Sequence, residues 1–218
     1  MTKMRSKFIL SPIIAIAMLA FFGVQFNTWI TRDTSVTSPP PKPEYALHRA
    51  TKESNFKKVG ALIEKGFSVN REDEKGITPF IEAVLKGDKP LVVLMLRHGA
   101  LAQPKLGFRH TPLRAACLTG NVDLIKMLLI KGADPNAKSE GDRTPLMGAC
   151  FLRPDYSDDL SLPAVQAMLE DPRTNPLIAN SFNETALDLC KQRNYTESVK
   201  LLEGAVAEST QKALPLFQ

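Results

Sequence analysis

Apolar and polar positions divide the chain into a long uncharged segment near its start and a periodic remainder. Residues 8–26 carry no charge and are predominantly apolar, and they follow three cations without an intervening acid. At a rise of about 1.5 Å per residue, a helix of this length nearly spans the hydrocarbon core of a bilayer, which needs roughly 20 residues. The pattern predicts a basic tip and a transmembrane helix within residues 1–30.

A cleaved signal peptide is the alternative interpretation of this segment, because signal peptides also begin with cations and continue with apolar residues. Their apolar core has about 7 to 15 residues and ends at a site of small side chains. Here the apolar run ends with the bulky residues Gln25 and Phe26, and Trp29 follows at the position of an interfacial aromatic belt. These features favour a retained signal-anchor over an exported soluble protein.

The distribution of cations predicts the orientation of the anchor. Lys3, Arg5 and Lys7 precede the apolar run, whereas Arg32 beside Asp33 stands nearly alone after it. By the positive-inside rule the N-terminus is cytoplasmic and the rest of the chain lies outside, which in a bacterial inner membrane means the periplasm. Residues 31–43 contain four prolines and lack apolar periodicity, so they predict an extended linker.

Beyond the linker the sequence repeats with a period of 33 residues. A Thr-Pro pair begins at Thr78, Thr111 and Thr144, where the threonine can cap a helix and the proline fits its first turn. Glycines recur with the same spacing at positions where a helix must end in the left-handed conformation: Gly66, Gly99 and Gly132. The pattern predicts pairs of helices joined by hairpin turns.

Two further registers predict how these helix pairs stack. One register holds small residues on the first helix of each pair, which lets neighbouring helices approach closely: Ala50, Ala83, Ala116, Ala149 and Cys190. The other lies on the second helix and predicts a continuous apolar spine: Leu62, Met95, Leu128, Leu169 and Leu202. No single unit can bury its apolar face alone, so stability depends on stacking.

Three segments carry a resemblance to a known family: GITPFIEAVLKGDKPLVVLMLRHGA, HTPLRAACLTGNVDLIKMLLIKGADPNA and RTPLMGAC. They resemble ankyrin repeats in their Thr-Pro-Leu starts, paired small residues, Gly-Asn or Gly-Asp turns and Gly-Ala ends. The resemblance implies an all-α ankyrin-repeat solenoid over residues 44–204, preceded by the single transmembrane helix and followed by a tail at 205–218. The repeats it implies span residues 45–77, 78–110, 111–143, 144–184 and 185–204.

The fourth repeat departs from the period. It is eight residues longer than the others, and the excess falls at residues 153–162, which predicts an inserted loop between its two helices. Such loops often carry recognition in repeat proteins. The loop contains Asp155, Asp158 and Asp159, but the glycine and glutamate of a calcium-binding loop are absent, so solvated acids are favoured over a calcium site or a site for a basic partner.

Charge and cysteine spacing exclude two classes of function. The formal net charge is +5, but three cations lie before residue 8, and the repeats carry only about +2, too little for nucleic-acid binding. Cys117, Cys150 and Cys190 lack the spacing of a zinc site, and their odd number argues against a disulfide scaffold. Cys117 and Cys150 occupy equivalent positions in neighbouring repeats, about 10 Å apart, so we expect buried free thiols.

Catalytic chemistry is not indicated. His48, His98 and His110 lie in different repeats, and His48 fits the capping histidine of the ankyrin motif. No catalytic, nucleotide-binding or metalloprotease motif is present, so neither an enzyme nor a cofactor is expected. The remote alternative is a metal-dependent hydrolase built from Asp155, Asp158, Asp159 and His110.

Protein binding is the function that the resemblance implies. Leu85, Leu118 and Phe151 share one position in three successive repeats, where they either form a partner site on the concave face or pack beneath the neighbouring hairpin. We expect a partner protein that the module protects or inhibits, the alternative being an immunity protein that neutralises a secreted toxin. The candidate contact residues are Leu85, Lys86, Phe108, Arg109, Leu118, Thr119, Phe151, Leu152 and Tyr156.

Overall fold

A computed structural model describes residues 43–103, 109–151 and 158–213. The predicted anchor, with its apolar run at 8–26, and all but the last residue of the predicted linker at 31–43 therefore lie outside the described residues. Within these ranges, none of the helices combines the length and the apolar character that a membrane crossing requires.

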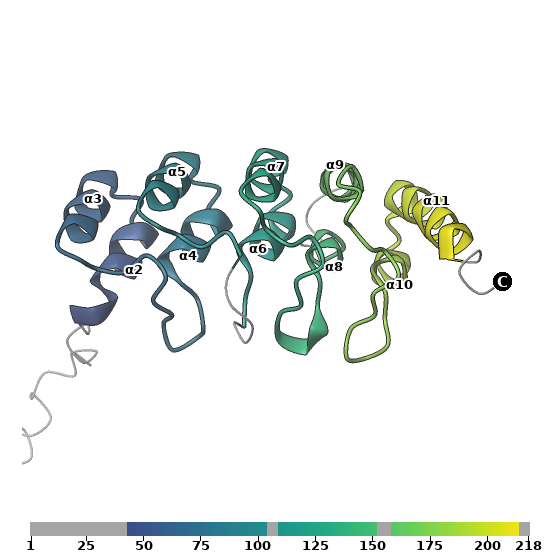
Figure 1. The fold of residues 1–218 in the computed structure, drawn as a ribbon, viewed down its shortest axis with the longest axis horizontal. Coiled ribbons are helices and arrows are strands. Elements are labelled where there is room, and N and C mark those ends of the chain that lie inside the picture. Colours follow the sequence, from purple (N-terminus) through teal and green to yellow (C-terminus); the bar gives the residue numbers. More distant parts are fainter. Residues whose placement is uncertain (1–42, 104–108, 152–157, 214–218) are drawn as a thin grey trace, which may run out of the picture. The chain divides into compact units, whose positions relative to one another are not determined.

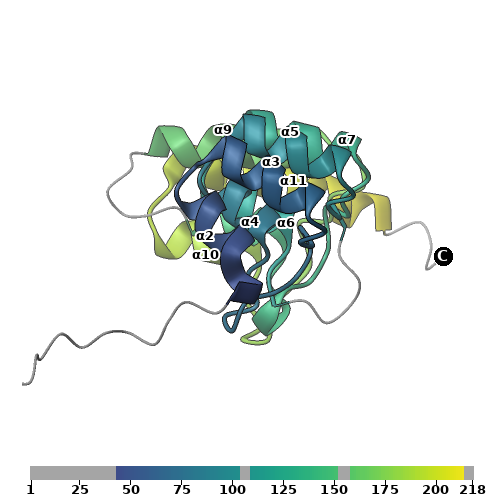
Figure 2. The ribbon, with the colours of Figure 1, turned by 90° about the vertical axis from the view of Figure 1, so that its left-hand side faces the viewer.

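Five pairs of helices follow one another along the described chain and stack in a row (Figure 1). The first helices form an inner layer next to the hairpins: α2 (Ala46–Lys52), α4 (Pro79–Leu85), α6 (Pro112–Leu118), α8 (Pro145–Ala149) and α10 (Ala186–Gln192). The second helices form an outer layer: α3 (Phe56–Glu64), α5 (Lys89–Arg97), α7 (Val122–Ile130), α9 (Asp158–Leu169) and α11 (Thr196–Ala213). Two short 3-10 helices complete the fold: η1 (Pro43–Tyr45) and η2 (Glu140–Asp142). The view along the row shows the two layers superimposed from pair to pair (Figure 2). The described residues are helical without a β-strand, which confirms the all-α solenoid.

The predicted helix starts and ends are confirmed. The hydroxyl oxygens of Thr78, Thr111 and Thr144 accept hydrogen bonds from the backbone N–H of the third residue of α4, α6 and α8 at 3.1, 3.3 and 3.4 Å. Gly66, Gly99 and Gly132, which follow the second helices α3, α5 and α7, have φ angles of 89°, 81° and 86°. These are left-handed values that side chains disfavour, so the period in the sequence reflects backbone requirements.

The small-residue register is fully buried, because all of its members, from Ala50 to Cys190, have no exposed surface. The apolar spine needs one correction: in α9 the fully buried residue at the spine position is Met168, whereas the predicted Leu169 is half-buried. The insertion shifts α9 by one residue relative to the expected register, and the remaining residue enters the turn after the helix. Leu62 is also half-buried, because α3 belongs to the first pair and has a neighbour on one side only.

Two predicted boundaries differ from the structure. α9 begins at Asp158, so residues 158–162 of the predicted loop are helical, and Asp158 and Asp159 stand in the first turn of a helix. α11 continues to Ala213, so residues 205–213 of the predicted tail are helical as well. Pro163 and Gly204 stand at the two expected boundaries, but both lie inside a helix, so neither residue ends the helix there.

A ladder of side-chain amides joins the turns that follow the outer helices. The Asn70 amide donates to the carbonyl of Gly99 at 2.8 Å, and its oxygen accepts from Leu101 N–H at 3.0 Å. Asn136 makes the same pair of bonds to the next turn, at 2.7 and 2.8 Å. Between them stands Gln103, whose side chain accepts one hydrogen bond from Asp134 N–H at 3.0 Å. The ladder is thus regular except at the turn between α5 and α6.

Candidate partner-binding surface

The predicted contact residues Leu85, Leu118 and Phe151 lie at the C-terminal ends of three successive inner-layer helices. All three are half-buried, and Leu85 and Phe151 pack against the core. Their polar neighbours take part in internal contacts: the Lys86 ammonium donates to the Lys52 carbonyl, and the Thr119 hydroxyl donates to the Ala116 carbonyl at 3.0 Å. The apolar stripe therefore contributes to the stack while part of its surface stays accessible, and its role in binding stays a prediction.

Phe151 has the most distinctive surroundings of the stripe. The guanidinium carbons of Arg143 and Arg193 lie 5.5 and 5.0 Å from the centre of its ring. The ring face is electron-rich, so both cations are attracted to it. Arg143 immediately precedes the N-cap of α8, and Arg193 is the C-cap of α10. The contact therefore joins the fourth and fifth repeats.

Arg114 of α6 adds a third guanidinium to this surface. Burial lowers the pKa of Arg114, and the nearby charge of Arg143 lowers it further. The Nε atoms of Arg114 and Arg143 are buried without a hydrogen-bond partner. Within the described residues, none of the three arginines forms an ion pair. We call Arg114, Arg143, Arg193 and Phe151 the arginine cluster, and its unpaired donors are suited to binding carboxylates.

A disulfide joins Cys150 to Cys190 beside this cluster, with their Cα atoms 5.0 Å apart. The expectation of a buried free thiol at Cys150, and of no disulfide, was therefore wrong. Cys190 lies in the small-residue register, where neighbouring inner helices approach most closely, and Cys150 follows the equivalent Ala149. The expected distance of about 10 Å between Cys117 and Cys150 concerned equivalent positions of neighbouring repeats. Cys150 and Cys190 differ by one position within their repeats, and this pair was not considered. Cys117 is free and buried as expected, and burial raises its pKa.

The profile of the family described as ankyrin repeats (3 copies) matches residues 47–139 and 113–212. This chain belongs to the ankyrin repeat family. Ankyrin repeats are protein–protein interaction modules, and the family is in general not enzymatic. A comparison with curated proteins found no match.

The ankyrin histidine performs the structural role that the sequence predicts. His48 Nε2 donates to the Ile77 carbonyl at 3.0 Å and so ties α2 to the first hairpin. Burial lowers the pKa of His48, since the charged ring is poorly solvated there. Burial and the charge of Arg114 likewise lower the pKa of His110, whereas His98 is exposed.

The hairpins contain both predicted and unpredicted surface residues. Arg109 pairs with Glu140 of the next hairpin at 3.1 Å, across two exposed side chains. Phe182, in the hairpin before α10, has 70% of its surface exposed and was not predicted, although an aromatic residue in a polar turn is a usable signal. Phe108, Leu152, Tyr156 and Asp155 lie outside the described residues.

The hydrolase alternative stays untested, because Asp155 and the side chains of Asp158 and Asp159 lie outside the described residues. No three His, Cys, Asp or Glu side chains within them lie close enough together to hold a metal ion. The ankyrin scaffold instead presents isolated polar groups in separate repeats. Sequence reasoning also missed Arg114, Arg143 and Arg193, because they occupy different positions in their repeats and no period aligns them.

Proposed function

We propose that this ankyrin module is anchored to a membrane and holds a partner protein through its inner face, outside the cytoplasm, so as to protect or inhibit that partner. The arginine cluster is the observation that carries the proposal. It places three cations and one aromatic ring on the inner layer, the residue types most often found at binding hot spots.

The cluster also suggests the chemistry of the partner. A buried guanidinium without a counter-charge is unfavourable, and a carboxylate that pairs with it would recover the lost interaction. Two internal acids act on the cluster without forming an ion pair with it. The charge of Glu140, which pairs with Arg109, partly offsets the lowering of the Arg114 pKa. Hydrogen bonds from Asn180 and Gln192, together with the charge of Arg143, lower the pKa of Glu184. We therefore expect an acidic side chain of the partner, next to an apolar one that covers Phe151.

The disulfide supports a location outside the cytoplasm. Disulfides form and persist in oxidising compartments such as the periplasm or the extracellular space, and they are rare in the cytosol. A bond between Cys150 and Cys190 is therefore consistent with repeats on the outer side of the membrane, the orientation that the cations before residue 8 predict.

Affinity capture with the full chain tests the inner face. Wild-type protein should retain a partner from the source cells, and Arg143→Gln combined with Arg193→Gln should reduce its recovery at least about tenfold. A matched control removes two exposed lysines of the first repeat, Lys57→Gln with Lys65→Gln, and should bind as the wild type does. Equal recovery by the arginine variant and the control would overturn the inner-face proposal.

A protease-protection experiment tests the topology. In spheroplasts with an intact inner membrane, added protease should digest the repeats and leave a fragment from the N-terminal segment in the membrane. Repeats that resist protease until the membrane is permeabilised would place them in the cytoplasm, and repeats released in soluble form would indicate a cleaved signal.

A further inference from the structure

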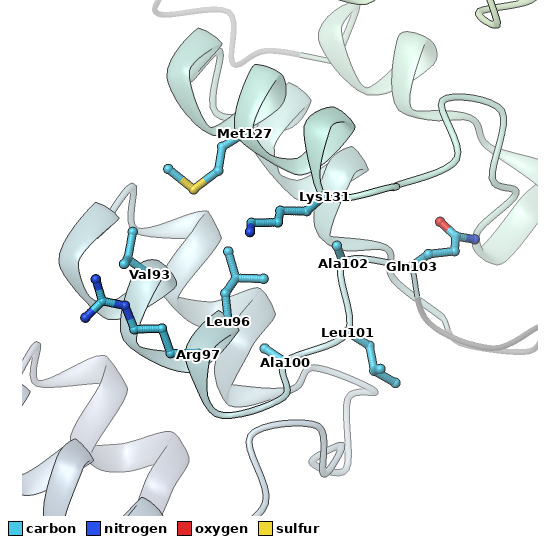
Figure 3. A pocket seen from close by; sticks show the side chains of 9 residues that line it. All are labelled: Val93, Leu96, Arg97, Ala100, Leu101, Ala102, Gln103, Met127 and Lys131. Carbon is cyan, nitrogen blue, oxygen red and sulfur yellow. The ribbon is translucent and has the colours of Figure 1, made fainter.

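The outer layer opens into a cavity of about 670 Å³ between α5 and α7 (Figure 3). Val93 and Leu96 line it from α5, and Met127 lines it from α7. In Figure 3 the side chains of Met127 and Lys131 both extend from α7 toward α5, with Leu96 between the two helices. Leu101, at the edge of the cavity, has 42% of its surface exposed. We call this cavity the outer groove.

The groove coincides with the irregular step of the amide ladder. Gln103 replaces the asparagine of the other turns, and its longer side chain bonds to Asp134 N–H across this step of the stack. Further along the outer layer α7 packs on α9, and α9 packs on α11. The outer groove therefore lies at the step where the connecting amide is one methylene longer.

The apolar surface continues beyond the outer groove. A second cavity of about 360 Å³ lies between α3 and α5, and it shares Val93 and Arg97 with the first. Phe56, on its border, has 49% of its surface exposed. Contiguous exposed apolar surface of this kind marks binding sites more often than solitary residues do.

Two cations border the outer groove without an acidic partner among the described residues. Arg97 lies in the last turn of α5 and Lys131 is the C-cap of α7. Other lysines of the outer layer are neutralised: Lys89 pairs with Asp123 at 2.9 Å, and Lys126 pairs with Glu170 at 2.8 Å. No acid lines the groove within the part of the chain that the structure describes, so its apolar floor is combined with uncompensated positive charge.

From this combination we propose that the outer groove is a second docking surface, and that it takes an amphipathic segment of a protein whose apolar side chains are flanked by carboxylates. The cavity volume suits a few apolar side chains, as when a helix lies in a groove. A protein segment fits better than a lipid surface, because a flat bilayer interface would leave the cavity unfilled. The groove lies in the layer opposite the arginine cluster, so this proposal is independent of the inner-face site.

Fluorescence anisotropy with two synthetic peptides tests the proposal. Both peptides present leucines at helical spacing, one with flanking glutamates and the other with flanking lysines. The full chain, held in nanodiscs of zwitterionic lipid, should bind the acidic peptide and not the basic one. Arg97→Glu with Lys131→Glu should weaken binding of the acidic peptide about tenfold or more and should admit the basic peptide.

The matched control makes the same change of net charge elsewhere: Lys75→Glu in a hairpin and Lys212→Glu in α11. It should bind the acidic peptide as the wild type does. Loss of binding in the control, or an equal affinity of the wild type for both peptides, would show that net charge or apolar contact alone is responsible and would overturn the proposal. An absence of acidic-peptide binding, with Arg97- and Lys131-dependent binding of anionic lipid vesicles, would also overturn it, in favour of a membrane contact.

Discussion

The second and third repeats differ from the fourth and fifth in what holds neighbouring units together. Between α4 and α6 the contact depends on alanines in one register, with no covalent bond. Between α8 and α10 the insertion interrupts the period of the sequence. The Cys150–Cys190 disulfide joins these repeats where the two inner helices lie close together. The regular second and third repeats are thus held together by complementary surfaces alone. The irregular fourth and fifth repeats are also joined by a covalent bond, beside the arginine cluster.

Removal of the disulfide should give the largest change in the free energy of unfolding, and it tests the difference between the two regions most directly. Cys150→Ala with Cys190→Ala opens a loop with a sequence separation of 40, which corresponds to a loss of about 4 kcal/mol in the free energy of unfolding. Urea denaturation with and without reductant measures it. Hydrogen exchange should accelerate in α10 and α11 and stay nearly unchanged in α4; a uniform change along the stack would contradict the account.

The spine residue of α9 gives the next largest effect. Met168 is fully buried and Leu169 is half-buried, so Met168→Ala should lower the free energy of unfolding by about 3 kcal/mol, and Leu169→Ala by about 1 kcal/mol. Thermal unfolding of the two variants decides between them. A larger loss of stability in Leu169→Ala than in Met168→Ala would instead support the register that the sequence alone predicts.

Glycine substitutions compare the tight step between α6 and α8 with the open first repeat. A Cβ at Gly148 would lie 3.1 Å from the Arg114 carbonyl oxygen and 3.3 Å from the Cys117 Cβ, so Gly148→Val should destabilise by about 2 kcal/mol through overpacking. A Cβ at Gly60 in α3 meets no atom within 4 Å. Gly60→Ala should therefore stabilise the protein by up to about 1 kcal/mol, and a stability loss in both variants would refute the difference in packing.

The smallest effect concerns pH. Burial lowers the pKa of His48 from its ordinary value of 6.5 in the folded state, so the unfolded chain binds more protons as the pH falls below about 6.5. Stability should decrease from pH 7 toward pH 5, and His48→Gln should reduce this slope. Denaturant titrations across that range measure it; an unchanged slope would assign the pH dependence to other groups, such as His110.

Much of the stack follows from residues that recur for a local reason. Thr78 and Gly66 were predictable because caps and left-handed turns require particular residue types, and Ala83 because close helix packing requires a small one. The register of α9, the Cys150–Cys190 bond and the approach of Arg143 and Arg193 to Phe151 were not, because each depends on how the insertion is accommodated. The outer groove lies beside Gln103, which stands where the period places asparagine at positions 70 and 136, but the substitution alone does not predict a cavity.

Hydrogen exchange on the full chain, with and without the partner recovered by affinity capture, tests the central claim most directly. Binding through the inner face predicts slower exchange in residues 143–151 and in α10, around the arginine cluster. Exchange in the outer helix α3 of the first repeat should change little. Protection confined to other surfaces, with exchange around the arginine cluster unaltered, would contradict the account.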